Sequence, residues 1–91
     1  MSWEIEFSEE FVKDIKKHQK AGSKILLKKI DSFLTEIRKN PTEGTGKPEQ
    51  LKYFDAEVWS RRIDSKHRLV YELKENNIAE ILSGWGHYED R

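Results

Sequence analysis

Cysteine is absent from the 91 residues, and its absence excludes several kinds of chemistry at once. The chain can form no disulfide, no thiolate nucleophile and no cysteine-ligated zinc site. Long apolar runs are also missing: none approaches the ~18 residues of a membrane-spanning helix. The first residues, MSWEIEFSEE, do not resemble a signal peptide. We therefore expect a soluble cytoplasmic protein that does not enter a membrane.

An excess of one charge is missing too. The chain has 17 Lys and Arg against 17 Asp and Glu, so it lacks the general positive field that draws a protein to any nucleic acid. The basic residues are nevertheless concentrated in the segment VKDIKKHQKAGSKILLKK and between Lys47 and Arg68. The first of these segments is interpreted by default as a solvated polar face, with a footprint for a large RNA surface as the alternative.

Proline and glycine are scarce, with two and five copies, and both prolines and two of the glycines lie in the stretch NPTEGTGKPEQ. This composition predicts one long loop, and long loops in compact domains are often functional. A chain of this length buries only about 60 to 70% of the surface that its unfolded form exposes. We therefore expect residues 1–91 to form a single domain with one core.

Hydrophobic periodicity predicts a strand followed by two helices. Apolar residues alternate with glutamates in WEIEF, as in a strand with one buried face. Ser8 and Ser23 are suitable N-caps for two helices, which should end at Ala21-Gly22 and at Asn40-Pro41. The expected apolar stripes are Phe11, Val12 and Ile15 on the first helix and Ile25, Leu26, Ile30, Phe33, Leu34 and Ile37 on the second.

Three strand-like runs, EVWSRRI, HRLVYELK and IAEILSGWG, complete the chain and are separated by short turns. The expected fold class is therefore α+β. It consists of a β-α-α unit followed by an antiparallel β meander, with both helices packed on one face of a small sheet. The other face would be open, and we expect the functional site there.

The turn DSK predicts the register of one hairpin. If it is a three-residue loop, Arg62 and Arg68 lie opposite each other on one face of the sheet. The expected pairs on the other face are Trp59 with Tyr71 and Arg61 with Leu69. Two opposed arginines repel by roughly 0.2 to 1 kcal/mol. Their placement is more natural if an anion such as phosphate lies between them.

The stretch GKPEQLK brings Glu49 to the start of the sheet. A glutamate in such a loop is usually only solvated, but its neighbours favour a second interpretation. If the loop folds over the open face, Glu49 lies near Arg62 and Arg68 around a phosphate-sized space. The last strand would bring His87 and Tyr88 to the same face. These residue types fit in-line attack of an RNA 2′-hydroxyl on its adjacent phosphate.

The candidate groups have suitable protonation states for this reaction. A carboxylate, with a reference pKa of about 4.3, is ionised at neutral pH and can act as the base. An imidazole, with a reference pKa near 6.5, stays partly protonated and can act as the acid. Arginine neutralises charge on the phosphoryl oxygens, and Tyr88 is a candidate for stacking on a base. No metal is required, and the sequence shows no plausible cluster of metal ligands.

Two other groups of polar residues have simpler interpretations. His18 and His67 lack the spacing of a metal site and are interpreted as structural or solvated. Glu9, Glu10 and Asp14 are close enough on one helix to hold magnesium, but the positive end of the helix dipole explains acids at a helix start more simply.

The motifs GKPEQLK, WSRRI, HRLVYE and the closing HY, in this order after a strand and two helices, resemble the YoeB (Txe/YoeB) toxins of the RelE superfamily. The resemblance implies a RelE-like toxin domain with ribosome-dependent endoribonuclease activity that cleaves mRNA in the ribosomal A site. It implies 2′-hydroxyl attack without a metal or cofactor, giving a 2′,3′-cyclic phosphate. The implied partners are a cognate YefM-like antitoxin, the 70S ribosome with its mRNA, and a second copy in a homodimer.

The resemblance also implies roles for individual residues. Glu49 corresponds to the general base, Arg68 to the transition-state stabiliser, His87 to the general acid and Tyr88 to a residue that positions the substrate. The expected binders of the RNA backbone are Lys47, Lys52, Arg61 and Arg62. The rival interpretation is a non-catalytic toxin or regulatory subunit of the same fold that acts by binding a protein target.

Overall fold

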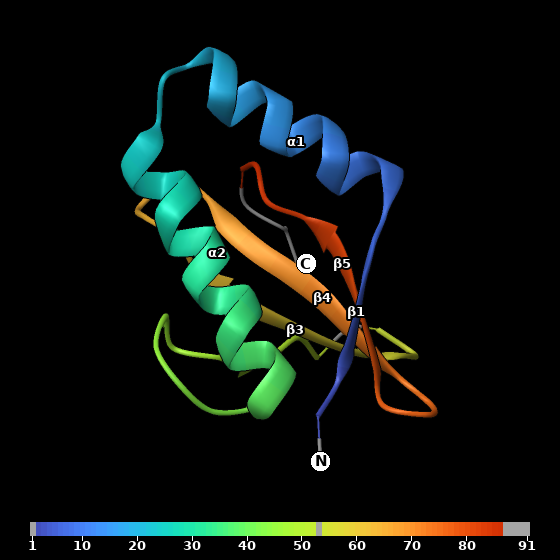
Figure 1. The fold of residues 1–91 in the computed structure, drawn as a ribbon. Coiled ribbons are helices and arrows are strands. Elements are labelled where there is room, and N and C mark those ends of the chain that lie inside the picture. Colours follow the sequence, from blue (N-terminus) through green and yellow to red (C-terminus); the bar gives the residue numbers. More distant parts are fainter. Residues whose placement is uncertain (1, 53, 87–91) are drawn as a thin grey trace.

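The computed structural model describes residues 2–52 and 54–86. Its elements are β1 (Glu4–Phe7), α1 (Glu9–Lys20), α2 (Lys24–Lys39), β2 (Glu49–Gln50), β3 (Glu57–Arg62), β4 (Arg68–Lys74) and β5 (Ile78–Ser83). They form one sheet in the order β1-β5-β4-β3-β2, with both helices in front of it (Figure 1). The predicted α+β fold is confirmed.

Two features of the sheet go beyond the sequence prediction. The strand β1 pairs with β5 in parallel, whereas β3, β4 and β5 form the predicted antiparallel meander. The chain between β1 and β5 runs through both helices and through β2, β3 and β4, so it is long enough to join parallel neighbours. The additional strand β2 pairs with β3 over only two residues, which is too short for a periodic pattern to show. No helix in the described residues is long and apolar enough to cross a membrane.

The two predicted N-caps differ in the structure. The Oγ of Ser8 accepts a hydrogen bond from the backbone N–H of Phe11 at 3.0 Å, so this cap is confirmed. Ser23 stands at the N-cap of α2, but its side chain makes no capping hydrogen bond. Both helices end where predicted, at Ala21 and at Asn40.

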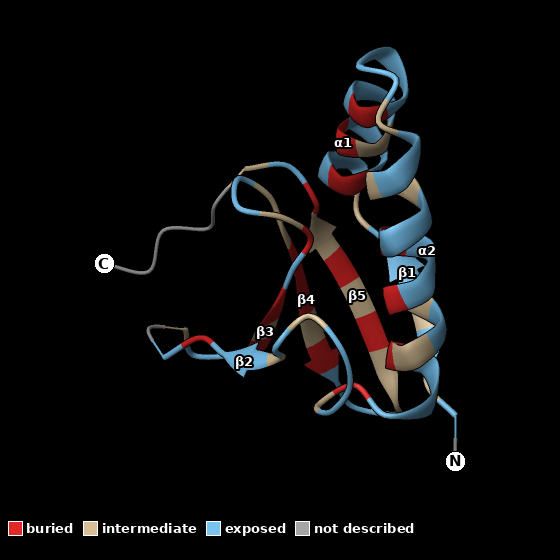
Figure 2. Ribbon diagram, turned by 90° about the vertical axis from the view of Figure 1, so that its left-hand side faces the viewer, coloured by how far each residue is buried: buried red, intermediate tan, exposed pale blue. Residues whose placement is uncertain are grey.

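The main core lies between the helices and the sheet, and both the helices and the central strands carry segments coloured as buried in Figure 2. Its fully buried members include Phe33 and Ile37 from α2 and Leu69 and Tyr71 from β4. Three residues predicted to be buried are instead exposed: Phe7 by 51%, Val12 by 44% and Ile25 by 80%.

The buried face of α1 is partly polar, which the apolar stripe did not predict. Phe11 is buried as expected, but Asp14 and His18 take the next inward positions and are only 1% and 0% exposed. They are one turn apart and lie on one face of the helix. Both side chains form hydrogen bonds to the backbone of Gly84, beyond the end of β5, and these bonds compensate part of the cost of burying polar groups.

The face of the sheet opposite the helices is only partly open. Leu51, Val58 and Val70 form a second buried cluster there, with Phe54 and Leu82 packed against it. The expectation of a wholly open face is therefore wrong at its centre, because the segment after β2 folds over it. The end of this face at the β3–β4 hairpin stays accessible, since Arg62 is exposed there.

Candidate active site

The β3–β4 hairpin places two arginines directly opposite each other. Arg62 is the register partner of Arg68, and the pairs on the other face are Trp59 with Tyr71 and Arg61 with Leu69, so the predicted register is confirmed. The hairpin is closed by a hydrogen bond of 2.9 Å from the N–H of Ile63 to the carbonyl of His67. Two guanidinium groups therefore lie on one surface with no intervening strand.

Glu49 is brought to these arginines by the pairing of β2 with β3. Its register partner is Ser60, and the N–H of Leu51 donates to the carbonyl of Val58 at 2.8 Å. The Oε1 of Glu49 lies 3.7 Å from Nη1 of Arg68. The carboxylate side chain is 67% exposed and the guanidinium side chain 23%, so both can meet a ligand from solvent.

Two small hollows that share Arg62 form the anion hollow of this site. One of about 280 Å³ is lined by Lys47, Pro48, Glu49 and Arg62, and one of about 240 Å³ is lined by Arg62, Asp64, Ser65 and Arg68. Three cations and two carboxylates therefore surround the space. The predicted RNA-binding residue Lys52 is exposed in the turn after β2 and belongs to neither lining.

Asp64 is a member of the anion hollow that sequence analysis missed. Burial would raise the pKa of its carboxyl group, but hydrogen bonds from the backbone N–H groups of Lys66 and His67 lower it below the ordinary value of 3.8. Its Oδ1 accepts these bonds at 2.8 and 2.7 Å. The ionised carboxylate therefore shapes the hairpin turn, and the turn motif DSK is the signal that could have indicated it.

Arg61 is turned away from the anion hollow, so the buried position of its side chain argues against the predicted contact with RNA. Its side chain is 0% exposed because the alternation of β3 turns it toward the helices, opposite to Arg62. Its guanidinium donates to Oε1 of Glu36 at 2.6 Å and to the hydroxyl of Tyr71 at 3.1 Å. It also donates to the carbonyls of Asn40, Glu43 and Thr45.

These contacts make Arg61 the internal anchor of the loop that carries Lys47 and Glu49. The Tyr71 hydroxyl donates in turn to the carbonyl of Pro41 at 2.6 Å. Burial raises the pKa of Tyr71, so this donor stays protonated at neutral pH. The loop before the site is therefore held from inside the protein and not only by solvent-exposed contacts.

Glu36 completes this anchor from α2. Burial would raise the pKa of its carboxyl group, but hydrogen bonds from the side chain and backbone of Thr45 and from Arg61 lower it below the ordinary value of 4.5. The bonds from Thr45 measure 2.7 and 2.9 Å. Two side chains on different elements thus fix the loop at the same point.

Glycine is required where the loop meets the core. Gly46 has a φ of +80°, and a Cβ added there would lie 2.6 Å from Cζ of Phe33. Its carbonyl accepts a hydrogen bond of 2.7 Å from the N–H of Arg62. A larger residue would strain the backbone and clash with the ring of Phe33, so glycine allows the loop that carries Lys47 and Glu49 to pack closely against the core.

The predicted residues His87 and Tyr88 lie outside the described residues. The chain just before them does have a defined place, because the N–H of Arg68 donates to the carbonyl of Gly86 at 3.0 Å. The covalent neighbour of His87 is therefore hydrogen-bonded to a residue of the anion hollow. A carboxylate, two guanidiniums and the chain that precedes an imidazole meet at one end of the sheet.

The fold defines a class of protein. The YafQ toxin in the E. coli DinJ-YafQ toxin-antitoxin complex has a TM-score of 0.79 to this chain at 19% identity, with 96% of this chain and 94% of that chain covered. Likeness at this identity concerns the fold alone, and the fold is that of the RelE-like toxins.

The family follows from closer relatives. The family model for the YoeB-like toxin of bacterial type II toxin-antitoxin systems matches residues 7–88, and the chain belongs to this family. It is 43% identical over 68 residues to the toxin YoeB of Synechocystis, covering 75% of this chain and 78% of that protein. The YoeB dimer from Staphylococcus aureus has a TM-score of 0.80 at 39% identity, with 97% and 100% covered. The same toxin in a heterotetrameric YoeB-YefM complex has a TM-score of 0.77.

Proposed function

We propose that this toxin is a ribosome-dependent endoribonuclease that cleaves mRNA in the ribosomal A site. The observation that carries the proposal is the convergence of Glu49, Arg68 and Gly86 at the hairpin end of the sheet. A protein that acted only by binding would not need the carboxylate of Glu49 beside the guanidinium of Arg68. It would also not need both groups next to the chain segment that leads to His87. Membership of the YoeB family supports the same function.

The reaction needs two proton transfers and no other reactant. Glu49 accepts the proton of the 2′-hydroxyl, and the 2′-oxygen forms a bond to the adjacent phosphorus while the bond to the 5′-oxygen breaks. His87 gives its proton to that 5′-oxygen. The products are a 2′,3′-cyclic phosphate and a 5′-hydroxyl, so atoms and charge balance.

Arg68 has two roles in this proposal. Its guanidinium stabilises the charge that develops on the phosphoryl oxygens. Because it lies 3.7 Å from Glu49, a phosphate bound to it would lie next to the base. Arg62 and Lys47 bind the phosphates on either side, and Lys52 extends this contact along the backbone. Tyr88 positions the substrate base or phosphate next to the acid.

The proposed partners follow from the relatives. The Staphylococcus aureus structures contain a YoeB dimer and a YoeB-YefM complex. We propose that this chain likewise forms a homodimer and is neutralised by a cognate YefM-like antitoxin. The site would work in the cytoplasm on mRNA that is held by the 70S ribosome.

The decisive experiment uses mRNA bound to purified ribosomes, with end mapping of the products. We expect a 2′,3′-cyclic phosphate at the cut, and no cleavage when the cut nucleotide carries a 2′-deoxy sugar. Because ribosomes need magnesium, metal dependence is tested with a phosphorothioate at the scissile phosphate, where thiophilic Mn²⁺ or Cd²⁺ should give no rescue. Cleavage of the 2′-deoxy message, or intact normal message, would reject the proposed reaction.

Single-turnover rates test the two proton-transfer roles. Glu49→Ala and His87→Ala should each slow cleavage by ~100-fold or more, which is ordinary for loss of a general base or acid. The matched control is Glu75→Ala, which removes an exposed carboxylate in the turn between β4 and β5 and should leave the rate unchanged. Rates within threefold of wild type for either site variant would remove that residue from the mechanism.

A further inference from the structure

The three residues that follow β5 are held by an unusual set of contacts. The N–H of Gly84 donates to Oδ2 of Asp14 at 2.9 Å, and its carbonyl lies 2.8 Å from Nε2 of His18. The N–H of Gly86 donates to Nδ1 of His67 at 2.8 Å, and its carbonyl accepts from Arg68 at 3.0 Å. All four backbone polar groups of these two glycines are therefore satisfied by residues distant in sequence, a set of contacts here called the tail clamp.

Three rings pack together at the centre of the tail clamp. The ring of Trp85 lies 4.8 Å from that of His18 and 4.5 Å from that of His67, and the two imidazoles are 4.9 Å apart, edge to face. Lys17 lies over the indole at 5.5 Å. His18 is fully buried, whereas Trp85 is 40% exposed, so the rings connect α1 to the surface next to the anion hollow.

The sheet itself does not require these contacts. The strand β5 ends at Ser83, and the residues past the last strand of a domain are ordinarily poorly ordered unless something holds them. Gly86 also adopts a φ of +79°, a left-handed conformation that glycine allows without strain. The clamp therefore fixes a turn in the residue that directly precedes His87.

We propose that His67, with the Asp14–His18 pair behind it, is a positioning residue that sets where His87 enters the active site. The inference rests on the proposed function, because it assigns a purpose to the clamp through the general acid. Fixing the Gly86 peptide fixes the origin of the next residue, and a displacement of about 1 Å at a reacting group costs on the order of 100-fold in rate.

The hydrogen bond from Gly86 makes the clamp sensitive to pH. An imidazole nitrogen accepts a hydrogen bond only when it carries no proton, so Nδ1 of His67 must be unprotonated for the bond to form. Among the described residues, the charged and titratable groups near this ring include Asp64, whose carboxylate accepts from the backbone N–H of His67, and His18, whose ring meets it edge to face. Lys17 lies over the adjoining indole of Trp85, and Arg68 is next in sequence. Protonation of Nδ1 in acid should therefore open the bond to Gly86.

The test compares two replacements of His67 in the full chain. His67→Asn keeps an acceptor attached to Cγ at the place of Nδ1 but does not titrate, whereas His67→Leu removes the acceptor. We expect His67→Leu to lower kcat for ribosome-bound mRNA by about 10-fold to 100-fold with KM within twofold. His67→Asn should retain kcat within about threefold, and its rate should fall less than that of the wild type between pH 7 and pH 5.5. Equal rates for Leu and Asn, or identical pH profiles for Asn and wild type, would overturn the inference.

A second measurement separates this inference from the proposed nuclease function. The amide proton of Gly86, followed by NMR in the full chain, should shift with the titration of His67 in the wild type and lose this dependence in His67→Asn. In His67→Leu the same amide should exchange with solvent at least tenfold faster, while amides of β4 stay protected. An amide that ignores both pH and the substitution would refute the clamp even if the protein cleaves RNA. A titrating amide in a protein without nuclease activity would leave the contacts of the clamp standing, but would refute the nuclease and with it the positioning role of His67.

Discussion

Neighbouring residues on one strand have opposite roles in this toxin. Arg61 and Arg62 are adjacent on β3, yet the first is 0% exposed and anchors a loop from inside, while the second is exposed and lines the anion hollow. The alternation of a strand separates them. The alternation pattern placed them on opposite faces correctly, but it contains no sign that the inward arginine contacts a glutamate and three carbonyl groups.

Replacing each arginine by methionine should separate the two roles. Arg61→Met removes one of the donors to Glu36 and the side-chain donor to three loop carbonyls, and we expect the free energy of unfolding to fall by about 3 kcal/mol or more. Arg62→Met should change it by less than about 0.5 kcal/mol, as is usual for an exposed position. Urea denaturation followed by circular dichroism measures both values. Similar losses for the two variants would contradict the buried anchor.

The same anchor should respond to acid through Glu36. Its pKa is lowered in the folded protein relative to the ordinary value of 4.5, so the carboxylate stabilises the fold fully above that value. This stabilisation is lost as the pH falls through the lowered folded pKa. Glu36→Gln lacks a titrating group at this position.

The wild type should therefore be more stable than Glu36→Gln at pH 7, and the difference should shrink as the pH is lowered below 4.5. Urea denaturation midpoints of both proteins, measured at intervals from pH 7 to below pH 4.5, test the prediction. A difference that stays constant or grows in acid would show that the folded pKa of Glu36 is not lowered.

At the scale of the elements, both helices have a serine at the N-cap, but the two serines lie in different surroundings. The Oγ of Ser8 accepts from the N–H of Phe11 and donates to the carbonyl of Leu82 at 2.8 Å, so it joins α1 to β5. Ser23 makes no capping hydrogen bond with its side chain. The serine before each apolar stripe thus predicted where both helices begin, but the contact of Ser8 with β5 depends on tertiary packing.

Alanine at these positions should have unequal effects. Ser8→Ala should lower the free energy of unfolding by roughly 1 to 2 kcal/mol, the usual cost of losing a helix cap. Ser23→Ala, its matched control, should cost less than about 0.5 kcal/mol. Thermal and urea unfolding of the two variants give the comparison. A larger effect at Ser23 than at Ser8 would contradict the assigned contacts.

The elements could be predicted because their apolar residues are periodic, whereas the site needed contacts between distant segments. The register of β3 and β4 followed from a three-residue turn, and with it the opposition of Arg62 and Arg68. The polar face of α1 did not follow, because Asp14 and His18 are buried against Gly84, 70 and 66 residues away. No local pattern in the sequence encodes such a pair.

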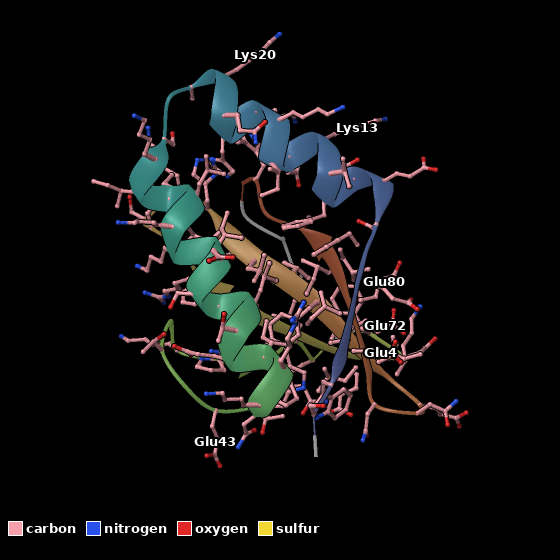
Figure 3. All side chains as sticks on the ribbon, viewed as in Figure 1. Glu4, Lys13, Lys20, Glu43, Glu72 and Glu80 are labelled. Atoms are coloured by element: carbon pink, nitrogen blue, oxygen red, sulfur yellow. The ribbon has the colours of Figure 1, made fainter. Side chains whose placement is uncertain are left out.

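At the scale of the whole molecule, the face of the sheet opposite the helices is divided by charge. Its hairpin end carries Arg62 and Arg68, whereas toward the other end Glu72 and Glu80 are direct partners, as their neighbouring labels in Figure 3 indicate. Glu80 is also the partner of Glu6 and pairs with Lys74 at 2.7 Å. A net charge of zero therefore hides a surface that attracts phosphate at one end and repels it at the other.

The salt dependence of RNA binding should locate the phosphate contacts on this surface. Each phosphate that is neutralised in single-stranded RNA contributes about 0.7 to the slope of log K against log salt concentration. Using RNA with a 2′-deoxy sugar at the cut, we expect Arg62→Met to reduce the slope by roughly 0.7. Lys13→Met and Lys20→Met are the controls, because these side chains extend from the outer side of α1 into solvent (Figure 3) and should leave the slope unchanged if the helical lysines are a solvated face. A reduced slope for the lysine variants, with none for Arg62→Met, would move the RNA from the hairpin end of the sheet to the helices.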